Sequence, residues 1–426
     1  MSFLIKNGIV VTGSAPPQKK DILLHNGVIE KVEEDIAPDD IWEVLDADGQ
    51  TIIPGLIDIC TEICDPGYEN RENILSVSKS AAKGGYTSIA SQCNTNPIVD
   101  NKTLTNYIVT KSRRQSLVNI FPCGSITSSE GRITEIGEML DEGIIAVSDG
   151  GTSVADAGLM LNILDYARMF NIPVIVTCED RHLADEGLIN KGRISTMLGL
   201  RGVPREAEEV MVARNLLLTR DHNPRLHIAN ISTRGSVELI RSYKKSGMSI
   251  SCSTNPHYFT LTEDALETYD TFAKVRPPLR THDDLEHIIE GIADGTIDVI
   301  ASGHSPATID SKLQEFDRAA YGISSLETSF PLSYTALVDS GRISFSRLIE
   351  CMSQNPAKIL GLDNKGDIKP GYDGDLCLVS KDRGYKIDGA QFASLAKFTP
   401  YQGYEVAAEV VYTVVSGQVV YINRRA

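Results

Sequence analysis

From Pro54 to about Leu362, the chain repeats one pattern, a short apolar run followed by a longer amphipathic stretch. Runs rich in β-branched residues predict buried strands, and repeated strand–helix units are typical of a parallel α/β sheet. The first strand should begin at Ile52 and end before the turn Asp65-Pro66-Gly67. The others are expected at 87–92, 118–124, 144–149, 173–180, 225–232, 249–254 and 297–303. Eight strands favour a TIM-type (β/α)8 barrel, although the periodicity alone also fits a doubly wound sheet.

Both ends of the chain predict strands outside the barrel. Near the N-terminus, two apolar runs are interrupted by Asn7-Gly8 and Asn26-Gly27, and Asn-Gly is the strongest short signal for a hairpin turn. After Leu362, strand patterns with Gly turns return. We therefore expect a small composite β-domain from both termini, residues 1–53 plus 363–426, beside a barrel of residues 54–362.

Composition narrows the partners and the compartment. A net charge of −16 excludes nucleic acid and anionic membranes as natural partners, because both would repel this surface. No apolar run reaches the ~18 residues that span a bilayer, and the N-terminus lacks the pattern of a signal peptide. The eight Cys form no C-x-x-C pair, so buried free thiols are expected. These features predict a cytoplasmic protein.

The stretch from Ile52 to Gly67 resembles a signature of the cyclic amidohydrolases. Pro54, Gly55 and Asp58 match their P-G-x-x-D frame, and Pro66 and Gly67 match the P-G of the dihydroorotase version. Further stretches follow in the order of that family: AAKGGYTSIASQCNTNP, SDGG, CED, LGLRGVPREAEE, HIANIST, NPHYFTLTED, KVRPPLR, GHSP, GISSLETSFPL and FTPYQG. The chain is thus identified as similar to dihydroorotases over nearly its whole length.

That resemblance implies where a metal centre would lie. Family His ligands fall on Cys60, Glu62, Thr177 and Asn230; a metal-bridging carboxylate falls on Asp149; and the Asp that serves as ligand and general base falls on Gly303. Of these six positions, only the metal-bridging carboxylate is kept, as Asp149. Side chains of a strand alternate, so Asp58, Cys60, Glu62 and Cys64 are expected on one face. The resemblance therefore implies no catalytic residues and no bound cofactor.

Substrate contacts implied by the resemblance are partly replaced. The Arg that grips a substrate carboxylate falls on Cys64, and an Asn falls on Arg276, whereas Asn94 is kept. Loss of such an Arg removes a charge-assisted contact of about 2 kcal/mol or more when buried. Arg276 is expected to compensate partly from another side of the pocket. If Glu62 and Asp149 line one dry cavity, a cation, a shared proton or Arg276 should lie beside them.

Several alternatives stay open for individual residues. Cys60, Glu62 and Asp149 form a candidate zinc site; the alternative, which we expect, is a pocket without metal. For Cys64 and Cys178, the two alternatives are redox-active thiols and buried structural residues, and we expect the second. His304 and His257 are expected to have a structural or pocket role, and His227 should face away from Asn230 on its strand.

The main prediction is a non-catalytic dihydroorotase homologue with a structural or regulatory role in pyrimidine biosynthesis. In this family such homologues occur as partners of aspartate transcarbamoylase, which is therefore the expected partner, and barrels of this size also often form homo-oligomers. The alternative is an active dihydroorotase or other cyclic amidohydrolase with a rebuilt zinc site. A third hypothesis is a protein that binds a small anion through Asn94 and Arg276.

Overall fold

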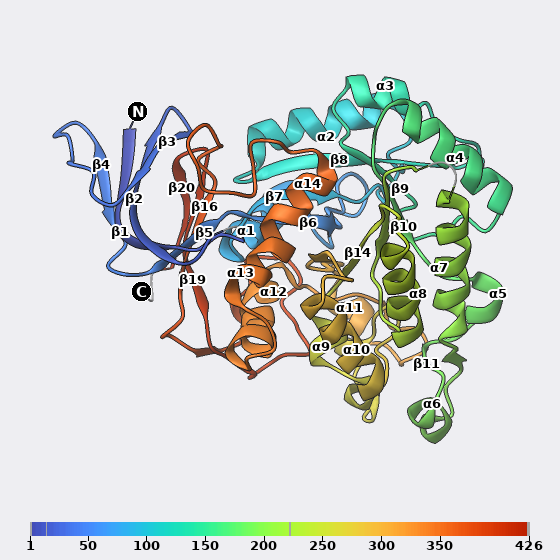
Figure 1. Ribbon diagram of the computed structural model, residues 1–426. Helices are drawn as coiled ribbons and strands as arrows, with labels where there is room; N and C mark the ends of the chain where they lie inside the picture. The colour runs from blue at the N-terminus through green and yellow to red at the C-terminus, as the bar shows by residue number, and fades with distance from the viewer. Residues whose placement is uncertain (1, 14, 221–222, 424–426) are drawn as a thin grey trace.

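The computed structural model describes residues 2–13, 15–220 and 223–423. Figure 1 shows two parts, a β-rich domain that lies beside a larger body of strands surrounded by helices. The first and last strands, β1 (Ser2–Val10) and β20 (Gln418–Ile422), both belong to the β-rich domain. The fold is α/β, with a parallel eight-stranded barrel sheet and an additional β-domain, as the sequence predicts.

The barrel sheet takes one strand from each predicted strand–helix unit. All its pairs are parallel, in the order β15-β14-β13-β10-β9-β8-β7-β6. The strands are β6 (Leu56–Thr61), β7 (Tyr86–Ser91), β8 (Asn119–Ser125), β9 (Ala146–Ser148), β10 (Val174–Thr177), β13 (Leu226–Ala229), β14 (Ser251–Thr254) and β15 (Val299–Ile300). Each overlaps a predicted strand, so the repeating pattern identified the barrel correctly.

Helices connect and cover these strands. The helices are α1 (Ile74–Lys83), α2 (Lys102–Gln115), α3 (Ile136–Asp141), α4 (Ala157–Met169), α5 (Arg181–Ala184), α6 (Arg193–Leu198), α7 (Glu206–Thr219), α8 (Arg234–Lys245), α9 (His257–Thr260), α10 (His282–Ala293), α11 (Ile309–Lys312), α12 (Leu326–Ser333), α13 (Phe345–Ile349) and α14 (Asn355–Leu360). Capping residues fix several starts, such as Asn73, which forms a capping box with Ser76 before α1. Two short strands, β11 (Ile189–Asn190) and β12 (Gly202–Val203), interrupt the path from β10 to α7.

The β-domain joins the two ends of the chain in one sheet. Its path is β20-β19-β16-β5-β1-β2-β3, and β4 pairs with β1. Its strands are β1 (Ser2–Val10), β2 (Gln18–His25), β3 (Val28–Glu33), β4 (Glu43–Asp46), β5 (Thr51–Pro54), β16 (Leu376–Ser380), β19 (Glu409–Val415) and β20 (Gln418–Ile422); β17 (Tyr385–Lys386) and β18 (Glu405–Val406) pair separately. The predicted composite β-domain is confirmed, and its division from the barrel at residues 53 and 363 stays a prediction.

Two local predictions were wrong. The run that starts at Ile52 is not one strand, because β5 pairs with β1 and β16 in the β-domain whereas β6 begins the barrel. Gly55 lies at this change of sheet, where an added Cβ would lie 2.2 Å from the Thr87 hydroxyl oxygen. Asn7-Gly8 is not a hairpin turn but a bulge within β1, because Gly8 packs against Ile52. Asn26-Gly27 does form the predicted turn, between His25 and Val28.

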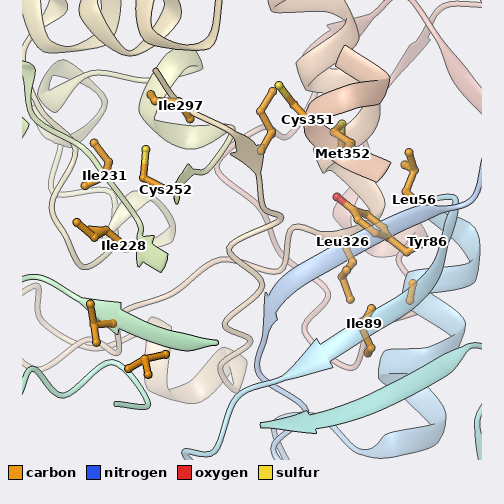
Figure 2. Packing of buried hydrophobic residues seen from close by; sticks show 14 of the residues in the cluster. Leu56, Tyr86, Ile89, Ile228, Ile231, Cys252, Ile297, Leu326, Cys351 and Met352 are labelled. Atoms are coloured by element: carbon orange, nitrogen blue, oxygen red, sulfur yellow. The ribbon is translucent and has the colours of Figure 1, made fainter. Parts of the chain in front are cut away.

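The barrel strands are buried on both faces. Leu56, Val147 and Ile228 belong to the large cluster that packs against the helices, and Figure 2 shows Leu56 and Ile228 within it. Their chain neighbours Ile57, Ala146 and Ala229 belong to a second cluster. This alternation follows the pleat of a strand, and small residues such as Ala146 and Ala229 suit a narrow barrel interior.

A buried carboxylate connects the first and last strands of the barrel sheet. Asp58 on β6 is fully buried and accepts hydrogen bonds from the Ser302 backbone N–H at 2.7 Å and from the Ser302 hydroxyl at 2.6 Å, directly after β15. The Glu62 N–H also donates to the His304 carbonyl at 3.0 Å. These bonds bring residues 60–62 and 302–305 together at one rim of the barrel.

The eight cysteines are free thiols, of which Cys60 alone is half-buried and the others are buried, as predicted. Within the described residues, none of the helices combines the length and apolar character needed to cross a bilayer.

Replacing Asp58 tests the closure of the barrel. Asp58→Ala leaves the buried Ser302 N–H without its acceptor, so we expect the free energy of unfolding to fall by about 3 kcal/mol in urea titrations. Ser302→Ala, which removes only the hydroxyl donor, should cost about 1 kcal/mol. Equal stability of Asp58→Ala and the unmodified chain would show that this bridge does not hold the barrel.

Candidate functional site

A pocket of about 230 Å³ opens at the carboxyl ends of the barrel strands. Its lining follows from the topology, because each parallel strand delivers the residues at its end to the same rim. The lining residues are Cys60, Glu62, Gln92, Asn94, Gly150, Gly151, Thr177, Glu179, Asn230, Asn255, His257, Val275, Arg276, Pro277, Gly303, His304, Ser305, Tyr321, Gly322 and Ile323. The predicted positions Cys60, Glu62, Thr177, Asn230 and Gly303 thus meet in one cavity, together with Asn94 and Arg276.

The Cys60 thiol is held by a carboxamide. Gln92 Nε2 donates to Cys60 Sγ at 2.6 Å, and the Gln92 carbonyl oxygen accepts a hydrogen bond from the Ser148 hydroxyl at 2.9 Å. Burial and the nearby Asp58 carboxylate raise the pKa of Cys60 well above its ordinary value. Cys60 is therefore a neutral thiol in this pocket.

Glu62 is neutralised by Arg71. The Arg71 guanidinium lies 3.1 Å from a Glu62 carboxylate oxygen, and the Ser305 hydroxyl donates to the other oxygen at 2.8 Å. Arg71 also donates to the Pro306 carbonyl at 2.8 Å, which fixes its position. Of the alternatives that the sequence left open, the group beside Glu62 is a cation, Arg71, whereas Arg276 contacts Glu179.

Asp149 lies next to Gly150 of the lining and is bound by backbone groups. It accepts hydrogen bonds from the N–H of Thr177 at 2.7 Å and of Gly151 at 3.1 Å. Burial raises the pKa of Asp149 to about 7, although these two N–H groups act in the opposite direction. Near neutral pH, this carboxyl group is thus close to its midpoint of ionisation.

Arg276 does not present a free positive charge to the pocket. Its guanidinium contacts both carboxylate oxygens of Glu179, with distances of 2.7 Å from Nη2 and 2.9 and 3.0 Å from Nε. The guanidinium also lies 5.6 Å from the centre of the Tyr321 ring. The expected compensation for the missing Arg is therefore opposed by Glu179.

Gly303 has no room for a side chain. Its φ of +65° is unfavourable for residues with a Cβ. An added Cβ would lie 2.8 Å from Asn255 Cγ and 2.9 Å from His257 Cε1. The Asn255 and Asn230 carboxamides are in turn 2.8 Å apart. Side chains of neighbouring strand ends thus fill the space beside Gly303.

The three histidines of the predicted motifs have different surroundings. His304 is fully buried, 3.5 Å from the Glu72 carboxylate, and its Nδ1 accepts from the Ser325 N–H at 3.2 Å. Burial tends to raise the pKa of Glu72, but His304 lowers it below its ordinary value. His227 contacts the hydroxyls of Ser251 and Ser253 and does not line the pocket, as expected. His257 lines the pocket, and burial lowers its pKa to about 3.

Cys64 and Cys178 are buried, and burial raises the pKa of Cys64 to about 12. The prediction that Cys64 shares a face with Cys60 and Glu62 was wrong. Strand β6 ends at Thr61, and Cys64 has a left-handed backbone with φ +58°, so the alternation of side chains does not reach it.

The connection from His304 to Gly322 contributes both of its ends to the pocket lining. Two buried lysines hold this segment in place, Lys312 within it and Lys274 outside it. Lys274 donates to the carbonyls of Phe316 at 2.6 Å and Ala319 at 2.7 Å. Lys312 donates to the Thr271 carbonyl at 3.0 Å, and burial together with the charge of Lys274 lowers the pKa of Lys312 to about 7. Tyr321 and Gly322 are thereby kept at the pocket wall.

These donors do not fit a zinc ion. Across residues 2–13, 15–220 and 223–423, no three His, Cys, Asp or Glu side chains are grouped so that they could hold a metal. The suggested set of Cys60, Glu62 and Asp149 is divided among separate partners, namely Gln92, Arg71 and the Thr177 N–H. Thr177 and Asn230 replace neutral imidazole donors poorly.

Sequence reasoning missed the residues that complete the pocket. Gln92 and Asn255 each directly follow a strand, after β7 and β14, so their position at the strand end was the signal available. Arg71 lies in the connection from β6 to α1 and Tyr321 in the connection from α11 to α12, and no local pattern marks them.

Comparisons with known proteins agree with this architecture. Fold and pocket together define a barrel protein of the amidohydrolase superfamily: residues 49–236 match a family described as dihydro-orotase-like, and residues 306–421 match the amidohydrolase family. The chain is 43% identical to a dihydroorotase of Caldanaerobacter subterraneus subsp. tengcongensis, over 99% of this chain and 97% of the relative. It is also 43% identical to a dihydroorotase of Acetivibrio thermocellus, over 98% of each. The chain therefore belongs to the dihydroorotase family.

Solved structures show the same fold. The L-hydantoinase (dihydropyrimidinase) of Arthrobacter aurescens superposes with a TM-score of 0.89 at 26% identity, over 98% of this chain and 95% of that one. The dihydropyrimidinase of Brevibacillus agri NCHU1002 gives a TM-score of 0.88 at 23% identity, over 100% and 96%, which bears on the fold alone.

A pair of glycine substitutions measures the crowding at Gly303. Gly303→Ala and Gly151→Ala both place a Cβ at positive φ, but nothing lies within 4 Å of an added Cβ at Gly151. We expect Gly151→Ala to cost about 1 kcal/mol of unfolding free energy from backbone strain. Gly303→Ala should cost about 2 kcal/mol more, because Asn255 and His257 must move.

Urea titrations of both variants provide the measurement. Equal losses of stability would show that the space beside Gly303 accepts a side chain, contrary to the geometry.

Proposed function

We propose that this chain is a non-catalytic member of the dihydroorotase family with a structural or regulatory role in pyrimidine biosynthesis. The observation that supports this most strongly is at Gly303, where the family resemblance places the Asp that serves as ligand and general base. Hydrolysis of a cyclic amide needs an activated water and a group to manage its proton. Gly303 has no side chain, and Asn255 and His257 occupy the adjacent space.

The remaining positions support the same proposal. Where the resemblance places His ligands, the chain has Cys60, Glu62, Thr177 and Asn230. The first is a neutral thiol bound to Gln92, and the second is paired with Arg71. A charge-neutral, crowded pocket is a poor site for a divalent cation, which prefers anionic or imidazole ligands with free lone pairs.

A second candidate is an active dihydroorotase, or another cyclic amidohydrolase, with a rebuilt zinc site. The similarity to named dihydroorotases favours it, because 43% identity extends over 99% of the chain. This function would require zinc ligands drawn from Cys60, Glu62 and Asp149. Their present hydrogen bonds and ion pair would have to break first.

A turnover assay separates the two candidates. The purified chain should convert no dihydroorotate or carbamoyl aspartate above the rate in buffer, with and without added zinc. The Caldanaerobacter dihydroorotase, assayed in parallel, serves as the positive control. Zinc-dependent turnover by this chain that is lost in Cys60→Ala would favour the second candidate and refute the first.

We further propose aspartate transcarbamoylase as a partner, a cytoplasmic location and self-association of the barrel. The partner follows from the resemblance to inactive family members that bind this enzyme. A non-catalytic chain that covers 97% of a dihydroorotase relative is consistent with a role in assembly, because an interaction surface needs the fold but no metal centre.

Size-exclusion chromatography of mixed purified proteins tests the partner. The chain and the aspartate transcarbamoylase of the same organism should elute together, at a smaller volume than either alone. An unrelated acidic protein of similar size is the control for nonspecific association. Separate elution at micromolar concentrations would contradict the partner proposal and would leave the turnover result unaffected.

A further inference from the structure

A second cavity, of about 220 Å³, lies at the opposite end of the barrel from the pocket described above. It is formed where the neighbouring strands β10, β13, β14 and β15 begin, so that Pro173, Ser251 and Asp298 lie at or just before a first strand residue. Helix α14 covers this end of the barrel, because its Ala357 and Leu360 pack against the interior cluster. In the described part of the chain, the two cavities share no lining residue.

Among the described residues, Arg225 is a half-buried cation of this lining without a carboxylate partner. Its Nη1 and Nη2 atoms donate to the carbonyls of Asn171 and Ile359, each at 2.7 Å. A guanidinium has five N–H groups, and these two bonds leave the others available. Burial lowers the pKa of Arg225 below its ordinary value, although the charge of Asp363 acts in the opposite direction. The carbonyls therefore hold the guanidinium in position but do not neutralise it.

Lys358 brings a second cation to the same cavity. It directly precedes Ile359, whose carbonyl holds Arg225, so the two cations belong to adjoining parts of the wall. Its side chain is exposed, and across the described ranges its ammonium group makes neither a hydrogen bond nor an ion pair. Two cations beside one cavity repel each other, and an anion bound between them turns that repulsion into attraction.

The one carboxylate of this lining is already paired. Lys244 Nζ contacts the two Asp298 oxygens at 2.7 and 2.6 Å, and the Cys252 N–H donates to the same carboxylate at 2.8 Å. The lining thus keeps the positive charge of Arg225 and Lys358, on a chain whose net charge is −16. A local field opposite in sign to that of the whole molecule attracts small anions to this cavity.

The rest of the wall offers a hydroxyl donor and apolar surface. Ser249 is exposed, and within the described residues its hydroxyl makes no hydrogen bond, so it is available to an oxyanion. Leu226, Ile250 and Pro173 provide apolar contacts. The volume of about 220 Å³ is below the ~300–1,000 Å³ of sites for drug-sized molecules. The cavity therefore suits a small molecule with an anionic group and a short carbon body.

From these observations we propose that the cavity at the amino ends of β10, β13, β14 and β15 binds a small phosphate monoester, with Arg225 and Lys358 contacting the phosphate. A phosphate monoester carries a charge of about −1.5 to −2 near neutral pH, which matches two unpaired cations, whereas a carboxylate carries a single charge. The fork of a guanidinium also fits phosphate oxygens. This site goes beyond the proposed function and does not depend on it.

Three probes test the class of ligand. Propyl phosphate is a monoester with a short apolar body, butyrate is a chain of similar length with one negative charge, and inorganic phosphate has no carbon body. In calorimetric titrations of the full chain at pH 7.5 in phosphate-free buffer, propyl phosphate should bind at least about tenfold more tightly than either of the others. Absence of propyl phosphate binding at millimolar concentration, or equal affinity for butyrate or for inorganic phosphate, would overturn the proposal.

Variants locate the binding. Lys358→Gln removes a cation that makes no contact within the described chain, and it should lower the affinity for propyl phosphate about tenfold. Ser249→Asp places a carboxylate beside the two cations and should lower the affinity at least as much. Lys245→Gln is the matched control, because Lys245 is an exposed cation at the end of α8 outside the lining. It should leave the affinity unchanged.

The outcomes of these titrations are distinct. Equal losses in Lys358→Gln and Lys245→Gln would show a general attraction of anions and would contradict the proposed site. Arg225→Gln tests the guanidinium directly and should abolish binding. If that variant fails to fold because its carbonyl contacts are lost, Lys358→Gln and Ser249→Asp decide, and unchanged binding in both refutes the proposal. None of these results alters the turnover assay, which concerns the pocket at the other end of the barrel.

Discussion

The hydrogen bonds between Asp58 and Ser302 are the interaction on which the site depends. The ladder of parallel strands ends at β6 on one side and β15 on the other, and the buried carboxylate of Asp58 joins these two ends. Because β6 and β15 are thereby held together, Cys60 and Glu62 come to lie opposite Gly303, His304 and Ser305. Asp58 itself does not line the pocket, because it is fully buried and bound by Ser302 and Thr61.

Charge neutrality is the second organising property of the site. A cavity that contains Glu62, Glu179 and Arg276 would repel or attract ions strongly if any of them were unpaired. Each has a partner: Glu62 contacts Arg71, and Glu179 contacts Arg276. Glu72, which contacts His304, comes from the same connection after β6 as Arg71. The connection that begins at the first barrel strand therefore neutralises the rim locally. Within the described part of the chain, the side chains of His257 and Asn94 in the lining make no hydrogen bond, and neither does the buried His304 Nε2 atom.

The sequence predicted the barrel, and it predicted that the site residues would meet at one rim of it, for a physical reason. Strand periodicity is local, and residues that follow parallel strands meet at one rim whatever the details of packing. Contacts between distant segments were not predictable in this way. The pairing of Arg276 with Glu179, the bulge at Asn7-Gly8 and the change of sheet at Gly55 each depend on a neighbour far along the chain or in another element.

Metal content tests the central proposal, that this pocket binds no zinc. Elemental analysis of protein purified without chelator, then dialysed against excess zinc and desalted, gives the stoichiometry directly. The account predicts far less than one zinc per chain, and no change in Cys60→Ala. Stoichiometric zinc that survives desalting and is lost in Cys60→Ala would contradict it, because that thiol would then be a ligand.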